Sequence, residues 1–306
     1  MSAEGFKLED AASYDDVALA FDALTERYSR PLAQALALAI RAGERRRVID
    51  MGCGTGLVAF EAARLAGAGT EVIGIDLSQG MLRAAEAKAA AGGLAGRVRF
   101  LRGDAEALDL PDGHADGFVS LYAFRHFPHP ERAAAEAFRV LAPGCRLALA
   151  VGSAPRLLSW QGLGRAAAAA RRALRERLGR ERAATDHLEG LVRRHLRSVP
   201  EVETSGWSDA MRDPSGALAA MVRAAGFAEV RLGWVGAESR VPGTAEFWDL
   251  QATLSTPARK RMARARPEEL AALRAAFEAD CEAVLARGGR LTYRVGAAVV
   301  TARKPG

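Results

Sequence analysis

Short apolar runs alternate with helix-forming segments through the first half of this chain. Strand-like runs lie at residues 48–51, 71–76, 98–101, 117–122 and 146–151. The segments between them are predicted helices, the clearest at residues 57–66, 78–91 and 130–141. Five strands separated by helices predict consecutive βαβ units, so we expect an α/β fold on a parallel sheet.

The pattern changes after Gly152. Residues 153–212 contain no strand-like run and are predicted to form arginine-rich helices. Two more strands are expected at 228–235 and 291–302, with a second helical block at about 237–289 between them, and helical periodicity also covers 14–41. We therefore predict four segments: an N-terminal helical cap at 1–44, a core at 45–152, a helical insert or lid at 153–212, and the C-terminal part of the core at 213–306.

Composition narrows the class of partner. The 306 residues are 49% hydrophobic, enough to bury a sizeable core, and the formal net charge of +6 raises nucleic acid as a partner. Only four of the 43 basic residues are lysines, and the arginines are interleaved with Asp and Glu rather than gathered in one block. This distribution disfavours nucleic-acid binding.

Sequence features also bear on compartment and metal binding. No apolar run approaches the length of a membrane span, and residues 1–10 lack the apolar segment of a signal peptide. The three cysteines, Cys53, Cys145 and Cys281, are odd in number and share no metal-ligand spacing. We therefore expect a cytoplasmic protein without a metal site.

Three glycines at alternate positions, Gly52, Gly54 and Gly56, follow the first predicted strand. Glycine adopts positive φ without strain, and without a Cβ it lets a ligand approach backbone N–H groups at a helix N-terminus. This loop predicts a nucleotide-like cofactor. It does not identify the cofactor, because residues 54–59 also satisfy a dinucleotide-binding pattern.

Acidic residues follow three of the predicted strands. Asp50 stands before the glycine loop, Asp76 ends the second strand, and Asp104 follows the third. Because the carboxyl ends of parallel strands meet at one edge of a sheet, these side chains should converge on one crevice.

These segments together resemble the class I S-adenosylmethionine-dependent methyltransferases. The resemblance runs from residue 48 to 151 and is carried by residues 48–56, 74–82, 103–108 and 138–147. Residues 124–127, Phe-Arg-His-Phe, most resemble the ubiquinone/menaquinone C-methyltransferase branch and its small-molecule relatives. The resemblance implies a Rossmann-like, doubly wound, mostly parallel seven-stranded sheet with an antiparallel last strand.

The resemblance also implies a cofactor, S-adenosyl-L-methionine, which leaves as S-adenosyl-L-homocysteine. Asp50 would accept from its α-amino group, Asp76 would take both ribose hydroxyls, and Asp104 would accept from the adenine amino group. The implied cofactor-binding set is Asp50, Gly52, Cys53, Gly54, Thr55, Gly56, Asp76, Leu77, Met81, Gly103, Asp104, Ala105 and Leu121.

The catalytic candidates follow the fourth strand. Methyl transfer from a sulfonium needs alignment and exclusion of water, and needs a general base only if the acceptor must lose a proton. His126 is the candidate base, with Tyr122 and Arg125 beside it as further catalytic candidates. Each has a structural alternative: His126 could pack locally, and Arg125 could pair with a carboxylate.

The acceptor is not identified by the sequence, and it can be carbon, oxygen or nitrogen. Four tryptophans, Trp160, Trp207, Trp234 and Trp248, favour an apolar or aromatic small molecule. A nicotinamide-dependent reductase would not need Asp50 or Asp104, and a nucleic-acid methyltransferase would carry a different tetrapeptide after the fourth strand. A cofactor-binding relative with regulatory or other chemistry stays open, as does a homodimer.

Overall fold

The computed structural model describes residues 2–153, 170–184, 187–201 and 214–306. Chain contacts divide it into two compact units. Unit 1 comprises Met1–Ala154, Thr204–Val235 and Gly296–Gly306, and unit 2 comprises Pro155–Glu203 and Gly236–Val295. Both units are assembled from segments that are distant in sequence.

Unit 1 is built on a twisted sheet whose strands run in the order β3-β2-β1-β4-β5-β8. The first five strands in the chain are parallel to one another: β1 Arg47–Met51, β2 Glu71–Asp76, β3 Val98–Arg102, β4 Ala115–Leu121 and β5 Leu141–Gly152. β8 (Arg290–Arg303) pairs antiparallel with β5, from Arg146 opposite Arg303 to Gly152 opposite Ala297. β7 (Ala228–Val241) also pairs with β8.

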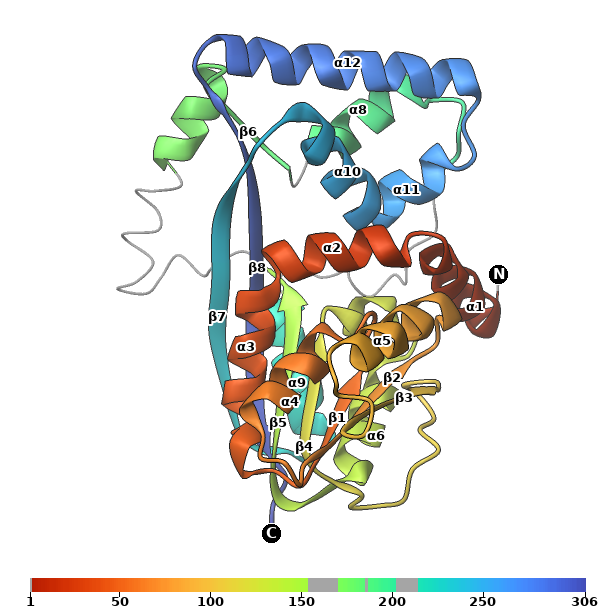
Figure 1. The fold of residues 1–306 in the computed structure, drawn as a ribbon, viewed down its shortest axis with the longest axis vertical. Helices are drawn as coiled ribbons and strands as arrows, with labels where there is room; N and C mark the ends of the chain where they lie inside the picture. The colour runs from red at the N-terminus through yellow and green to blue at the C-terminus, as the bar shows by residue number, and fades with distance from the viewer. Residues whose placement is uncertain (1, 154–169, 185–186, 202–213) are drawn as a thin grey trace. The chain divides into compact units, whose positions relative to one another are not determined.

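Successive residues of a strand point to opposite faces of the sheet, and those of β1 are buried on both faces. Helices therefore cover both faces of this sheet. Ile49 and Met51 of β1 belong to a buried core shared with helices α6 and α9. Val48 of β1 and Ile40 at the end of α3 both lie near Gly117 of β4, where an added Cβ would be 3.3 Å and 3.1 Å from their side chains. Figure 1 shows the helices around the strands. Their bounds are α1 Ala3–Asp15, α2 Ala18–Tyr28, α3 Arg30–Ala39, α4 Leu57–Leu65, α5 Gln79–Ala91, α6 Pro130–Val140 and α9 Pro214–Ala224, with 3-10 turns at Ala42–Glu44 (η1) and Ala123–His126 (η2).

Unit 2 is mostly helical. Its helices are α8 His187–His195, α10 Thr244–Leu254, α11 Thr256–Met262 and α12 Pro267–Ala286, and residues 170–177 are also helical. One face of α12 buries Leu273, Phe277, Cys281 and Val284, which are spaced by three and four residues. A short strand, β6 (Glu181–Ala183), pairs in parallel with Arg290–Thr292 at the start of β8.

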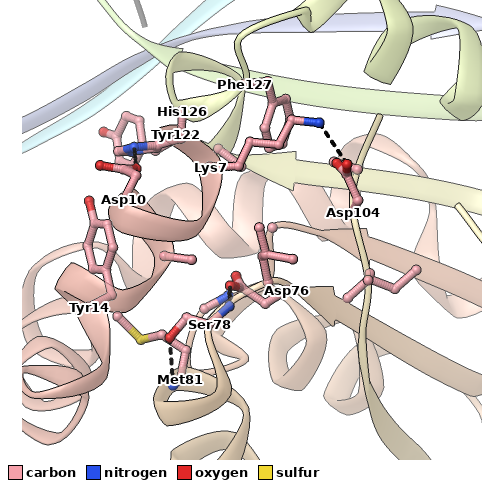
Figure 2. Close-up of a pocket in the computed structure, with 18 of the residues that line it drawn as sticks. Lys7, Asp10, Tyr14, Asp76, Ser78, Met81, Asp104, Tyr122, His126 and Phe127 are labelled. Carbon is pink, nitrogen blue, oxygen red and sulfur yellow. Dashed lines mark hydrogen bonds and ion pairs between the residues drawn. The ribbon is translucent and has the colours of Figure 1, made fainter. Parts of the chain in front are cut away.

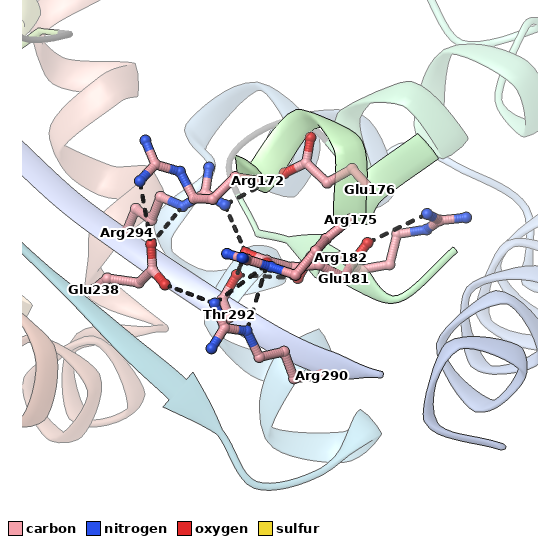
Figure 3. A network of polar contacts seen from close by, with 9 residues as sticks. All are labelled: Arg172, Arg175, Glu176, Glu181, Arg182, Glu238, Arg290, Thr292 and Arg294. Atoms are coloured by element: carbon pink, nitrogen blue, oxygen red, sulfur yellow. Dashed lines mark hydrogen bonds and ion pairs between the residues drawn. The ribbon is translucent and has the colours of Figure 1, made fainter. Parts of the chain in front are cut away.

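A buried carboxylate, that of Glu181, lies at the centre of a network of arginine contacts in unit 2 (Figure 3). The Glu181 side chain is fully buried and accepts from Arg175 Nε at 2.7 Å, from an Arg294 guanidinium nitrogen at 2.7 Å and from Thr292 Oγ1 at 3.1 Å. Burial alone would raise the pKa of Glu181, but these hydrogen bonds and the nearby charge of Arg290 lower it to about 2. Glu181 is therefore held as a carboxylate inside the unit.

The structure changes three expectations. The sheet has eight strands rather than seven, because β6 lies in residues 153–212, where no strand was predicted. That prediction was wrong because β6 has only three residues and is fixed by charged contacts rather than by an apolar pattern. The predicted helical start at residue 14 was also late, since helix begins at Ala3, with breaks before Ala18 and Arg30. The antiparallel last strand is confirmed. Trp160 and Trp207 lie outside the described residues.

Candidate functional site

The glycine loop joins β1 to α4 in unit 1. Gly52, Gly54 and Gly56 have φ values of +67°, +53° and +83°, a region that other residues rarely adopt. A Cβ added at Gly52 would lie 2.2 Å from the Cβ of Ala123, so this turn leaves no room for a side chain. Its backbone is anchored to β2, because Gly52 N and Cys53 N both donate to the carbonyl of Ile75.

A pocket of about 830 Å³, open to solvent, lies at the carboxyl ends of β1 to β4. Its position is the one at which open α/β sheets bind ligands. Figure 2 shows its side chains. The predicted residues that line it are Gly52, Gly54, Asp76, Leu77, Met81, Gly103, Asp104, Ala105, Leu121, Tyr122 and His126.

Asp76 faces the pocket from the end of β2. Its two carboxylate oxygens accept separately, from Gly54 N at 2.8 Å and from Ser78 N at 2.9 Å. Burial raises the pKa of Asp76, while these N–H groups oppose the rise. Asp76 therefore links the glycine loop to the start of α5, where the Ser78 side chain caps the helix by accepting from Met81 N.

Asp50 is buried behind the glycine loop and is not among the residues that line the pocket. One of its oxygens accepts from Ala59 N at 2.9 Å, and the other, Oδ1, has no hydrogen-bond partner among the described residues. Burial raises the pKa of Asp50 to about 7, and the negative charge of Asp76 adds to the rise. The hydrogen bond from Ala59 N lowers the pKa but does not offset the burial. A buried oxygen of this kind suits a ligand that carries a positive charge.

Asp104 follows β3 and has both oxygens engaged. Oδ1 accepts from Glu106 N at 2.9 Å, and Oδ2 lies 2.7 Å from Nζ of Lys7 on α1. Lys7 Nζ also lies 2.7 Å from Glu106 Oε2. Burial disfavours the charged form of Lys7, but the two carboxylates outweigh it and raise the pKa. Helix α1 is thus attached to the segment that follows β3.

His126 lies in the 3-10 turn η2, after β4. Its Nδ1 lies 2.8 Å from Oδ2 of Asp10, which comes from α1 (Figure 2). Tyr122 begins this turn with φ of +64°, unusual for a residue with a side chain, and its hydroxyl donates to the carbonyl of Gly296. Arg125 is exposed and does not line the pocket.

The remaining predicted cofactor residues lie beside the pocket rather than on its wall. Cys53, Thr55 and Gly56 are buried or form the turn into α4. Burial raises the pKa of the Cys53 thiol well above its usual value, so Cys53 is no nucleophile. Within the described part of the chain, no three His, Cys, Asp or Glu side chains could hold a metal ion.

Sequence reasoning did not predict Lys7, Asp10 and Asp15 of α1 as residues of the site. Lys7, Asp10 and Tyr14 line the pocket, and Oδ1 of Asp15 accepts from the Ser78 hydroxyl at 2.7 Å and from Gly80 N at 2.8 Å. Positions 7, 10 and 14 are spaced by three and four, so they share one face of a helix. This spacing would have revealed Lys7 and Asp10 if the helical periodicity had been followed toward the N-terminus.

The site fits an adenosine-bearing amino-acid cofactor. Glycine backbone lines one wall, Asp76 stands where a ribose could be held by a carboxylate, and Leu77 and Met81 offer an apolar surface beside Asp104 and Ala105. The unpartnered Oδ1 of Asp50, behind the loop, adds a buried acceptor.

Comparison with known proteins gives the same assignment. Residues 48–144 match the model of a methyltransferase domain family. The chain is 31% identical to nocamycin O-methyltransferase of Saccharothrix syringae over 294 residues, which is 95% of this chain and 96% of that protein. It is 38% identical to a ubiquinone/menaquinone biosynthesis C-methyltransferase of Methylobacterium nodulans over 139 residues, 44% of this chain and 55% of that one.

A third relative, demethylmenaquinone methyltransferase of Thermus thermophilus, is 45% identical over 102 residues, 33% of this chain and 45% of that protein. The chain thus spans about half the length of this relative and of the Methylobacterium enzyme. Among solved structures, the [4+2]-cyclase SpnF has a TM-score of 0.57 at 22% identity, with 98% and 97% of the two chains covered, which supports the fold.

The part of the chain that the structure describes has no helix long and apolar enough to cross a membrane. The nearly full-length match and the domain match agree with the pocket at the strand ends. The chain belongs to the class I S-adenosylmethionine-dependent methyltransferases.

Proposed function

We propose that this enzyme transfers the methyl group of S-adenosylmethionine to an oxygen of a small, apolar or aromatic acceptor, with His126 as the general base. The observation that carries the proposal is the position of His126, which lines the cofactor pocket with Nδ1 held by Asp10. An oxygen acceptor is favoured because nocamycin O-methyltransferase is similar over nearly the whole chain.

The cofactor, when bound, supplies a methyl group activated on a sulfonium sulfur. Asp76 would hold the ribose, Asp104 and Ala105 the adenine, and Asp50 the α-amino group behind Gly52 and Gly54. His126 would accept the proton of the acceptor hydroxyl as the oxygen takes the methyl group. Tyr14, Phe21 and Phe127 line the same pocket and favour an apolar acceptor.

The test is methyl transfer from S-adenosylmethionine labelled in its methyl group. The protein is incubated with phenols, enolisable diketones, hydroquinones and amines, and the product is examined by NMR for the atom that carries the label. We expect O-methylated phenol or enol, and at least a tenfold lower rate for His126→Asn. Transfer only to carbon or nitrogen would refute the oxygen assignment, and an unchanged rate in His126→Asn would refute the base.

Three further expectations belong to the same proposal. Cytoplasmic location is tested by cell fractionation, and self-association into a homodimer by sedimentation velocity. The role of the helical inserts at residues 153–212 and 237–289 as a lid is tested by hydrogen exchange with and without acceptor. A small molecule stays the expected partner, and nucleic acid is not expected.

A further inference from the structure

Asp10 and His126 come from distant parts of the chain and meet at the pocket. Asp10 lies on α1, His126 lies in η2, and Asp10 Oδ2 is 2.8 Å from His126 Nδ1 (Figure 2). The Asp10 side chain is only 8% exposed, so water screens this contact weakly. An acidic side chain buried this deeply on a terminal helix needs a specific partner, and the histidine is one.

The contact is held in place by packing on the same helix. Tyr14 lies four residues after Asp10 and therefore on the same face of α1. Its ring packs edge-on against the His126 ring, with centroids 5.7 Å apart and an angle of 85° between the planes. Tyr14 packs in the same way against Phe21 of α2. Aromatic contacts of this geometry fix the orientation of the imidazole ring.

The carboxylate also decides which ring nitrogen carries the proton. An ionised carboxylate only accepts, so Nδ1 must be the donor and the lone pair of the neutral imidazole is placed on Nε2. Among the described residues, the hydrogen bond of His126 is made through Nδ1, and none hydrogen-bonds to Nε2.

We propose that Asp10 is a positioning residue that holds His126 in the tautomer able to take a proton from the acceptor, so that α1 completes the catalytic apparatus. This inference rests on the proposed role of His126 as base. The proton passes from the acceptor oxygen to Nε2 while the oxygen–methyl bond forms and the methyl–sulfur bond breaks. Asp10 stays ionised throughout. The charged groups that act on His126 are Asp10 on α1 and Asp76 at the end of β2, with Arg125 beside it in the chain.

The first test needs no acceptor. Two-dimensional ¹H–¹⁵N NMR of the ¹⁵N-labelled protein reports the tautomer of each of the five histidines, and His126→Gln identifies the signal of interest. We expect the Nδ1–H tautomer of His126 in the parent protein and its loss in Asp10→Asn, whose amide can donate to Nδ1. An Nε2–H tautomer in the parent protein, or no change in Asp10→Asn, would overturn the inference.

The second test is kinetic and uses the acceptor found by methyl labelling. Asp10→Asn should lower kcat about 100-fold, with the loss shrinking at high pH, where the acceptor ionises unaided. Asp10→Glu should restore part of the rate. Binding of S-adenosylhomocysteine should stay within about threefold in both variants, which shows that they fold. Asp16→Asn, an exposed acid at the end of the same helix, is the matched control and should leave kcat unchanged.

The two proposals fail in different ways. If His126→Asn loses activity while Asp10→Asn keeps both its rate and its tautomer, the inference is wrong and His126 stands as base. If His126→Asn keeps full activity, the proposed base is wrong and the inference falls with it. If Asp10→Asn loses cofactor binding as much as rate, Asp10 serves the cofactor pocket and does not position the histidine.

Discussion

The affinity for cofactor should depend on pH through Asp50. This carboxyl has a pKa of about 7 because it is buried, so near neutral pH about half of it is protonated. A ligand that places an α-ammonium group beside Asp50 favours the ionised form. Binding below the pKa therefore releases a proton, and affinity rises as the pH rises toward the pKa and levels off above it.

The size of the effect follows from the pKa. If binding requires the ionised form, the fraction available changes from about one tenth at about pH 6 to about nine tenths at about pH 8. The expected gain in affinity is therefore about tenfold, or 1.4 kcal/mol. Because a free α-amino group itself loses its proton near pH 8, the window from about pH 5.5 to about pH 7 is the informative one.

The assay is isothermal titration calorimetry with S-adenosylhomocysteine, which keeps the α-amino group but has no methyl to transfer. Measurements in two buffers of different ionisation enthalpy count the protons released. Asp50→Asn is the control, because it keeps the shape of the side chain and cannot titrate. Since Asp76 and His126 face the same pocket, only the difference between parent and variant is assigned to Asp50. An Asn variant with the parent's pH slope would refute the reasoning, and would leave Asp50 as a support for the loop through Ala59.

Three other substitutions test the structure. Glu181→Gln should lower the free energy of unfolding in urea by about 2 kcal/mol, because it replaces a fully buried carboxylate that accepts charge-assisted hydrogen bonds from partly exposed arginines. Glu176→Gln, at a half-exposed position, should cost less than about 1 kcal/mol. Since the folded pKa of Glu181 is below its usual 4.5, its stabilisation is full above pH 4.5 and is lost as the pH falls through about 2, so the parent and Gln curves should converge in acid. Gly80→Ala should release the end of α1, because the new Cβ would lie 2.5 Å from Asp15 Cα, and hydrogen exchange would show faster exchange confined to α1. Asp76→Ala should weaken S-adenosylhomocysteine binding about 100-fold in calorimetry, since it removes two hydrogen bonds to a charged group; a loss below about threefold would contradict the ribose assignment.

The sheet and the cofactor pocket could be predicted because their signals are local. Strands in the core are short apolar runs, and Asp76 and Asp104 follow directly from where those runs end. The backbone conformation of the glycine loop could also be predicted, because glycine is the residue that adopts φ near +60°, as Gly52 and Gly54 do. Each of these features depends on a few neighbouring residues, so a single sequence carries it.

The parts that sequence did not predict depend on contacts between distant segments. The turn η2 shows this for the catalytic candidates: Phe124 is fully buried, Arg125 is exposed and His126 lines the pocket, because a 3-10 turn sends successive side chains in directions about 120° apart. The sequence motif does not show which of these three side chains faces the pocket. That depends on how the turn packs on the core, which the sequence does not show.

Helix α1 contacts three of the segments that form the cofactor pocket, and these contacts affect how the cofactor can enter. It contacts the segment after β3 through Lys7, the segment after β4 through Asp10 and the start of α5 through Asp15. Both oxygens of Asp104 are engaged by protein groups, so an adenine amino group that binds Asp104 as proposed would share or replace the contact of Lys7. Glu106 lies 2.7 Å from the same Lys7 nitrogen, which allows the lysine to give up Asp104 and keep one carboxylate. Exchange at Asp104 therefore need not release α1, and the helix that positions His126 can stay seated while the cofactor binds.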